Sequence, residues 1–167
     1  MKKYLFAALI FCLFTDCQSD KERTSLAAEI ETLQQEIGKE SRPSPEQLDQ
    51  FKTALLKYAE NFPDDSLSIK YLTKAGEAAR LLQQFDEAIR IYDRIGVQYP
   101  KHPESAKALF MKGFTYENDL GKLDSAKMIY SLFLEKYPDD DFADDARFLL
   151  NNLGKKPEEI LKEFGEQ

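Results

Sequence analysis

Two stretches of the chain decide the fold because they are copies of one pattern. Residues 76–100 read GEAARLLQQFDEAIRIYDRIGVQYP, and residues 113–138 read GFTYENDLGKLDSAKMIYSLFLEKYP. Each stretch begins at a glycine, carries an alanine and a tyrosine four residues apart, and ends at a tyrosine–proline pair. A third aromatic–proline pair, residues 62–63, precedes them, so that the prolines are spaced 37 and 38 residues apart. A fixed period of this length predicts an array of supersecondary repeats.

Each mark of the pattern has a physical cause. Small side chains are expected where two antiparallel helices cross closely, and larger ones fill the gap to the next helix. Proline ends the second helix of each pair because it cannot continue the hydrogen-bond ladder and disfavours α geometry in the residue before it. The small residues are Gly76, Gly113, Ala88 and Ala126, and the filling residues are Tyr92, Tyr130, Ile95 and Phe133.

Apolar residues at helical spacing predict the individual helices. The predicted ranges are about 45–62, 66–82, 86–99, 103–119, 123–137 and 141–153, followed by a short helix that Pro157 opens and that contains Ile160, Leu161 and Phe164. The first range begins with Ser44-Pro45-Glu46-Gln47, which predicts a capping box with proline at the first helical position. The chain is therefore predicted to be all-α, an antiparallel helix-hairpin solenoid of about two full repeats with flanking half-repeats, in a domain of residues 45–167.

These residues resemble the tetratricopeptide repeat, and the resemblance covers residues 45–153. The chain departs from that family in having Leu72 where tryptophan is common, and its period is longer than 34 residues. Longer periods that close with tyrosine–proline resemble an envelope subgroup of the family. That subgroup includes the Tol–Pal coordination protein and the lipoprotein subunit of the outer-membrane β-barrel assembly machine.

The resemblance implies where a partner would bind. In tetratricopeptide arrays the first helix of each pair lines the concave face, so the implied residues are Lys70, Thr73, Glu77 and Arg80, then Lys107, Phe110, Phe114 and Glu117, and finally Asp145, Phe148 and Asn152. The three phenylalanines predict an apolar patch for a peptide or helix. Two alternatives remain open: an insertion near Gly121 shifts this register by one, or the segment Ile160–Phe164 folds back over the patch.

The N-terminus is predicted to direct export. Residues 1–17 read MKKYLFAALIFCLFTDC, in which two lysines precede the apolar run Tyr4–Phe14. That run is shorter than the ~20 residues that cross a bilayer, and it has the length of a signal-peptide core. An ordinary secretory signal with an incidental cysteine is one interpretation of this stretch.

Phe14-Thr15-Asp16-Cys17 resembles the lipobox of bacterial lipoproteins, which we prefer over the secretory interpretation. The resemblance implies that residues 1–16 are removed and that Cys17 carries two acyl chains, enough for stable anchoring. Cys12 lies inside the apolar run and is the poorer candidate. Gln18 stands where an aspartate would retain the protein in the inner membrane, so the implied location is the outer membrane, facing the periplasm.

Residues 17–44 are predicted to be a polar stalk with one amphipathic helix. Its apolar residues are Leu26, Ile30, Leu33 and Ile37, with Gly38 as the C-cap and residues 40–44 as a linker. Two heptads are too few for a convincing coiled coil. Local docking on the repeat domain is therefore preferred over oligomerisation through residues 26–37.

No residue constellation in the chain predicts catalysis. The net charge of −7, without a basic stripe, disfavours nucleic acid as a partner. The lone His102 is expected near a helix N-cap, and the acidic cluster Asp139–Asp141 is expected at a helix start rather than around calcium. We predict no enzyme activity, metal or cofactor, but a lipid-anchored protein-interaction scaffold of the bacterial envelope. The alternatives are an oligomeric structural component of an envelope complex and an accessory subunit of an envelope enzyme.

Overall fold

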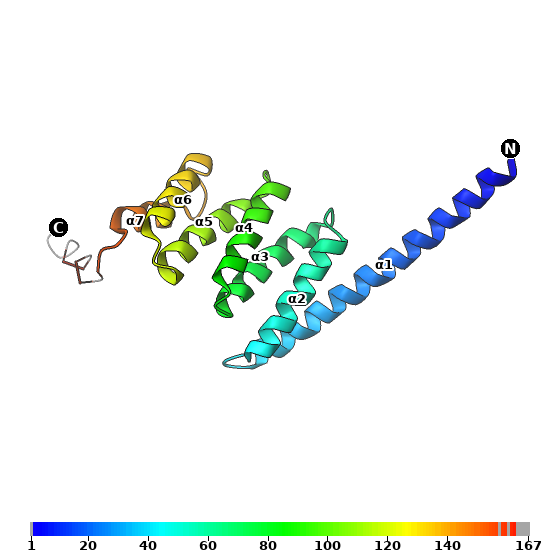
Figure 1. Ribbon diagram of the computed structural model, residues 1–167, viewed down its shortest axis with the longest axis horizontal. Coiled ribbons are helices and arrows are strands. Elements are labelled where there is room, and N and C mark those ends of the chain that lie inside the picture. The colour runs from blue at the N-terminus through cyan, green and yellow to red at the C-terminus, as the bar shows by residue number, and fades with distance from the viewer. Residues whose placement is uncertain (1, 157, 160, 163–167) are drawn as a thin grey trace.

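The described part of the chain is a stack of helices joined by short turns. The computed structural model describes residues 2–156, 158–159 and 161–162, and only the backbone of residues 2–18. Its elements are α1 (Lys2–Lys39), α2 (Pro45–Asn61), α3 (Ser66–Leu81), α4 (Phe85–Gln98), α5 (Glu104–Phe114), the π-helix η1 (Thr115–Asp119), α6 (Leu123–Lys136) and α7 (Ala143–Asn152). Successive helices pack against each other as antiparallel hairpins (Figure 1), and the described residues contain no strand. The predicted all-α helix-hairpin solenoid is confirmed.

The aromatic–proline pairs close the second helix of each hairpin with one geometry. The φ and ψ angles are −131° and 59° at Phe62, −129° and 50° at Tyr99, and −134° and 57° at Tyr137. Each of these residues donates its N–H to the carbonyl four residues earlier, and the following proline prevents a further turn. The prediction that proline ends these helices is confirmed. The Tyr99 hydroxyl also donates to the Pro63 carbonyl at 2.5 Å, which ties one closing turn to the previous one.

The glycines lie where the two helices of a hairpin touch. A Cβ on Gly76 would overlap the Tyr92 ring, and one on Gly113 would lie 2.7 Å from Cε1 of Tyr130. Real Cβ atoms do not approach ring carbons so closely, so only glycine allows these crossings. The predicted role of both glycines is confirmed.

A π-helix absorbs the longer period of the second repeat. Gly76 lies seven residues before Gln83, whereas Gly113 lies eight residues before the equivalent Gly121. Gln83 and Gly121 adopt the same left-handed backbone, with φ of 61° and 62°. The extra residue therefore lies between Gly113 and Gly121, where η1 replaces α geometry with a wider turn. The predicted insertion near Gly121 is thus confirmed, whereas the other alternative, the fold-back of Ile160–Phe164, falls largely outside the described residues.

The second half of α1 packs into the repeat core. Leu26 and Ile30 are 4% and 1% exposed, and they join a cluster that includes Phe51, Leu55 and Tyr58. Leu33 and Ile37 pack at its edge. The local docking that we preferred for this helix is what the structure shows.

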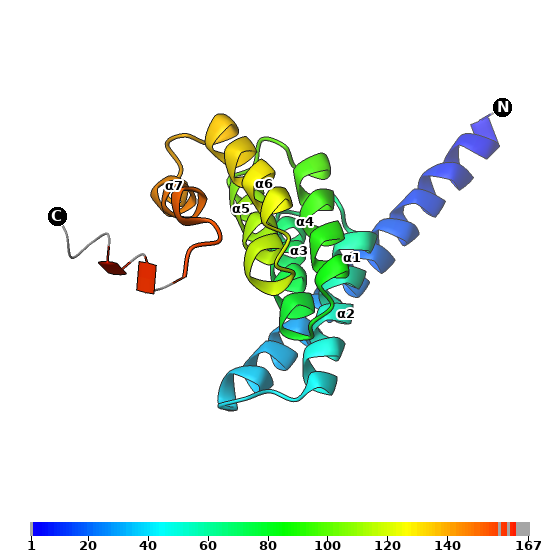
Figure 2. The same cartoon turned by 60° about the vertical axis from the view of Figure 1, so that its left-hand side comes forward.

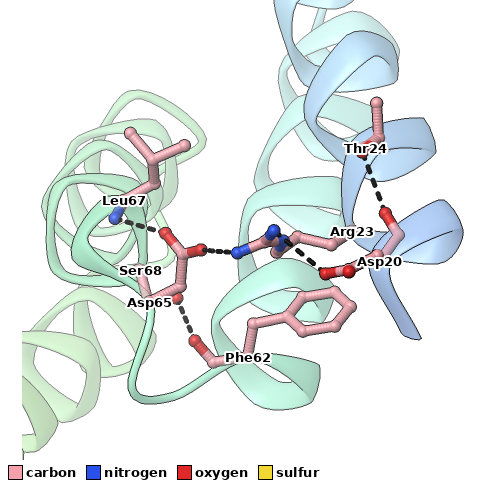
Figure 3. A network of polar contacts seen from close by, with 7 residues as sticks. All are labelled: Asp20, Arg23, Thr24, Phe62, Asp65, Leu67 and Ser68. Carbon is pink, nitrogen blue, oxygen red and sulfur yellow. Dashed lines mark hydrogen bonds and ion pairs between the residues drawn. The ribbon is translucent and has the colours of Figure 1, made fainter. Parts of the chain in front are cut away.

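A polar network fixes α1 above the turn between α2 and α3. Arg23 donates to Asp65 at 3.1 Å and to Asp20 at 3.0 Å, and Asp65 accepts the Leu67 N–H at 2.8 Å as the N-cap of α3 (Figure 3). The Leu67 N–H and then the Arg23 guanidinium hold the pKa of Asp65 below its usual range. Asn61 also donates to Glu22 at 3.0 Å. Docking of α1 therefore extends towards its N-terminus as far as Glu22.

The predicted leader and stalk lie in one continuous helix, α1. The helix continues to Lys39, so Gly38 lies in its last turn and the predicted left-handed cap at Gly38 is wrong. The backbone of residues 2–39 is one helix, and the side chain of Cys17 lies outside the described ones. Among the described residues, none of the helices combines the length and the hydropathy that a membrane span requires.

The predicted last helix falls largely on undescribed residues, although 158–159 and 161–162 are helical.

Candidate interaction groove

Four of the predicted concave-face residues meet between α3 and α5. Lys107 Nζ lies 2.8 Å from Glu77 Oε1, and the Arg80 guanidinium lies 4.9 Å from the centroid of the Phe114 ring. Arg80 also pairs with Asp119 of η1 at 2.5 Å, and this bond raises the pKa of Arg80. These contacts hold the first helices of the two repeats together. They also pair the charged side chains in the strip between α3 and α5. Lys70 lies exposed near the start of α3.

The predicted apolar patch of three phenylalanines does not form. Phe110 is only 7% exposed, and its ring stacks on Phe142, with centroids 4.8 Å apart, and packs against Phe133. Phe110 is therefore a core residue, and placing it on an open face was wrong. Phe142, directly before α7, covers it, and the segment Ile160–Phe164 lies largely outside the described residues. Phe148 is 43% exposed, on α7.

Glu117 was also placed on the wrong face. The widened turn of η1 directs its carboxylate towards α6, where it accepts the Tyr130 hydroxyl at 2.8 Å. Thr73 is buried and donates its hydroxyl to the Ile69 carbonyl within α3. Counting from the prolines gave the right face for Glu77, Arg80, Lys107 and Phe114 but not for Thr73, Phe110 and Glu117.

An open apolar groove lies between α1 and α3, with α2 as its floor. Its volume is about 290 Å³, and its lining is Gln34, Ile37, Leu48, Phe51, Lys74, Glu77, Ala78 and Leu81. Leu81 is 68% exposed in the last turn of α3. An exposed leucine beside a preformed apolar hollow is the kind of feature that binds an apolar side chain of another molecule.

The groove continues beyond Leu48 and Leu81 to the turn between α1 and α2. This second hollow, of about 650 Å³, shares those two leucines with the first. Its other lining residues are Arg42, Pro43, Ser44, Pro45, Leu82 and Gln83. The capping box at Ser44 fixes the backbone that forms one wall of this second hollow. The Ser44 hydroxyl accepts the Gln47 N–H at 3.2 Å, and the Gln47 side chain accepts the Ser44 N–H at 2.7 Å. We call the two hollows together the α1–α3 groove.

The charge of the α1–α3 groove is positive although the chain is acidic. Its charged lining residues are Arg42, Lys74 and Glu77, and Glu77 is paired with Lys107. Lys74 donates to the neutral Gln34 at 2.5 Å. No carboxylate in the described part of the chain lies within ion-pair distance of Arg42 or Lys74. The groove therefore suits an apolar segment that carries carboxylates.

Other polar clusters have structural roles. Lys52, only 6% exposed, binds Asp49, Gln84 and Glu87 at 2.5–3.1 Å and so ties α2 to the start of α4. Burial disfavours its charge, but the bonds to Glu87 and Asp49 outweigh burial and raise the pKa of Lys52. His102 accepts the Glu104 N–H at 3.1 Å at the start of α5, as predicted. Among the described residues no cluster of histidine, cysteine and carboxylate side chains fits a metal ion.

Sequence reasoning missed the α1–α3 groove for an identifiable reason. Ile37 belongs to the predicted stalk, whereas Leu48 and Phe51 belong to the predicted helix 45–62, so the three residues were not expected to lie together. Leu81 lies beside the apolar stripe of α3 rather than in it. The pair of leucines at 81–82 was the one indication of the groove in the sequence, because the apolar stripe of a single amphipathic helix does not need both residues.

Comparison with known proteins agrees with this architecture. Residues 71–102 and 107–140 match the sequence model of the tetratricopeptide repeat. The two matches lie on the hairpins α3–α4 and α5–α6. No curated protein sequence matches the chain.

Proposed function

We propose, on the premise that this chain is a tetratricopeptide-repeat protein, that it is a lipid-anchored interaction scaffold of the bacterial envelope. Tetratricopeptide repeats generally mediate protein–protein interaction and are typically not enzymes. The partner is an apolar peptide or helix that carries carboxylates, and it binds in the α1–α3 groove. The observation that carries the proposal is this open apolar groove with Arg42 and Lys74 at its edge, neither of which forms an ion pair with a carboxylate among the described residues.

The site differs from the one expected from the repeat pattern alone. The strip between α3 and α5 is occupied by its own pairs, Glu77 with Lys107 and Arg80 with Asp119. A ligand there would have to replace these ion pairs, whereas in the α1–α3 groove Leu81 is exposed and Lys74 donates to the neutral Gln34 rather than to a carboxylate. The docked α1 supplies one wall, so the segment first interpreted as a stalk becomes part of the binding site.

The binding proposal is tested by a matched pair of variants. Leu81→Glu places a carboxylate in the groove, and Val97→Glu makes the same change in the last turn of α4, where Val97 is 81% exposed outside it. Both variants are expected to fold. After crosslinking in envelope membranes, Leu81→Glu should lose the partner that the parent and Val97→Glu retain. Equal capture by all three proteins would refute the groove as the site.

Anchoring at Cys17 rests on the sequence of the leader. The basic residues, the short apolar run and the cysteine at its end support it. Cys17→Ser is expected to abolish incorporation of labelled fatty acid and to leave the protein soluble or uncleaved. Normal processing and unchanged membrane fractionation of Cys17→Ser would contradict the lipid anchor without affecting the groove.

A further inference from the structure

The chain itself contains a segment with the chemistry that the α1–α3 groove suits. Residues 157–167 read PEEILKEFGEQ, with four glutamates and one lysine. Ile160, Leu161 and Phe164 are spaced one and three residues apart, a sequence pattern typical of the apolar side of an amphipathic helix. Leu161 is 70% exposed, and residues 158–159 and 161–162 are helical. The segment is thus an acidic amphipathic stretch with an exposed apolar residue.

The groove and this segment are complementary in three respects. The groove offers an apolar floor and wall in Leu48, Phe51 and Leu81, and the segment offers three large apolar side chains. In the groove, Arg42 and Lys74 form no ion pair with any carboxylate that the structure describes, and the segment carries an excess of carboxylates. The length of the groove, formed by two hollows that share Leu48 and Leu81, suits more than one side chain in succession.

The two elements belong to opposite ends of the helix stack. The groove is formed by α1, α2 and α3, whereas the segment follows α7, and Figures 1 and 2 show α7 at the other end of the helix stack from α1 and α2. The helices α4, α5 and α6 lie between them. With three helices between the groove and the end of α7, the segment that follows α7 is placed to reach the groove of a neighbouring molecule rather than that of its own chain.

We propose that residues 157–167 of one copy bind in the α1–α3 groove of a second copy, head to tail. This inference rests on the proposed binding role of the groove and names its partner. Such an interface joins two different surfaces, so each added copy leaves one groove and one segment free, and assembly continues along a line. A short helical segment binds weakly alone, but anchoring on one membrane raises the effective concentration of its groove.

Peptide binding gives the first test. The probe is a fluorescein-labelled peptide of residues 156–167, titrated with the full chain in detergent and followed by fluorescence anisotropy. Leu81→Glu should weaken binding about tenfold or more, because it puts a charge into an apolar contact. Val97→Glu should leave binding unchanged. Peptides with Phe164→Ser, or with Glu158, Glu159 and Glu163 changed to Gln, should bind several-fold more weakly. Absence of binding, or equal binding to both full-chain variants, would overturn the inference.

Photo-crosslinking in cells distinguishes this inference from the proposed function. A photoreactive amino acid at position 81 of the full chain should capture residues 157–167 of another copy, identified by mass spectrometry, and Phe164→Ser in the full chain should abolish that product. A photoreactive residue at position 97 is the matched control. A crosslink from position 81 only to a different protein would uphold the groove and overturn self-assembly. No crosslink from position 81 would overturn both.

Discussion

The hairpins α3–α4 and α5–α6 solve the same packing problem with different polar groups. In both, a tyrosine of the second helix packs over a glycine of the first, Tyr92 over Gly76 and Tyr130 over Gly113. Burial raises the pKa of both tyrosines, and the bond to Glu117 raises that of Tyr130 further. The Tyr130 hydroxyl donates to Glu117, whereas the Tyr92 hydroxyl is buried without a hydrogen-bond partner among the described residues.

The difference between the two tyrosine hydroxyls arises from one position in the first helix of each hairpin. Counting from the preceding proline, Arg80 stands where the second hairpin has Glu117. A guanidinium cannot accept a hydrogen bond, and Arg80 is directed at Asp119 of the next hairpin instead. The first hairpin therefore leaves one hydroxyl unsatisfied and makes a contact between hairpins. The glycine and the tyrosine recur in both hairpins because the close crossing of the helices requires them. The polar residues differ between the hairpins because they contact different neighbours.

The largest expected effect tests what the two hairpins share. Gly76→Ala and Gly113→Ala place a methyl group against a tyrosine ring, so each should lose about 2 kcal/mol of unfolding free energy, within the usual range for overpacking. Gly96→Ala is the control, because a Cβ there meets nothing within 4 Å. That variant should gain about 0.5 kcal/mol from helix propensity. Urea unfolding measures all three, and a stabilised Gly113→Ala would show that the hairpin crossing is looser than described.

The second prediction tests the difference in hydrogen bonding between the two hairpins. Tyr130→Phe removes a hydrogen bond to a carboxylate and should cost about 1.5 kcal/mol. Tyr92→Phe removes a buried hydroxyl without a partner and should be neutral or slightly stabilising. Thermal unfolding of both variants is the measurement. Equal losses would mean that the Tyr92 hydroxyl has a partner and that the contrast between the hairpins is false.

The parts of the fold that follow from local sequence were predictable. A proline after an aromatic residue stops a helix wherever it stands, so the ends of α2, α4 and α6 followed from the three pairs. The capping box at Ser44 and the tight crossings at Gly76 and Gly113 depend only on residue size and local hydrogen bonds.

The parts that depend on distant partners were not predictable. One extra residue between Gly113 and Gly121 was visible in the period, but the sequence did not show that a π-turn would direct Glu117 to α6. Phe110 has the same spacing whether it faces solvent or Phe142, because periodicity gives a face but not what covers it. The α1–α3 groove needs side chains from three helices, and no single segment encodes it.

The third prediction concerns the turns that join the hairpins. Ser68 Oγ donates to the Phe62 carbonyl and Ser105 Oγ to the Tyr99 carbonyl, both at 2.5 Å, whereas the equivalent position, the first residue of α7, is Ala143. Ser68→Ala and Ser105→Ala should each cost about 1 kcal/mol, the usual value of such a bond. Ala143→Ser should gain some of that amount by donating to the Tyr137 carbonyl. Chemical unfolding measures the three variants, and a destabilised Ala143→Ser would show that the third turn differs in shape.

The smallest expected effect concerns the turn inside each hairpin. Gln83 and Gly121 share a left-handed backbone, but only glycine adopts it without strain, so the first hairpin carries a cost that the second avoids. Gly121→Gln meets no atom within 4 Å and should therefore lose stability through backbone strain alone, about 0.5–1 kcal/mol. Gln83→Gly should gain about 0.5 kcal/mol, because relief of strain exceeds the added freedom of the unfolded chain. The exchange of both residues in one chain should leave the urea midpoint nearly unchanged, since the sites are distant and their effects add. If Gly121→Gln is neutral while Gln83→Gly is destabilising, the two turns do not share a conformation, and the equivalence of the hairpins ends at their glycine crossings.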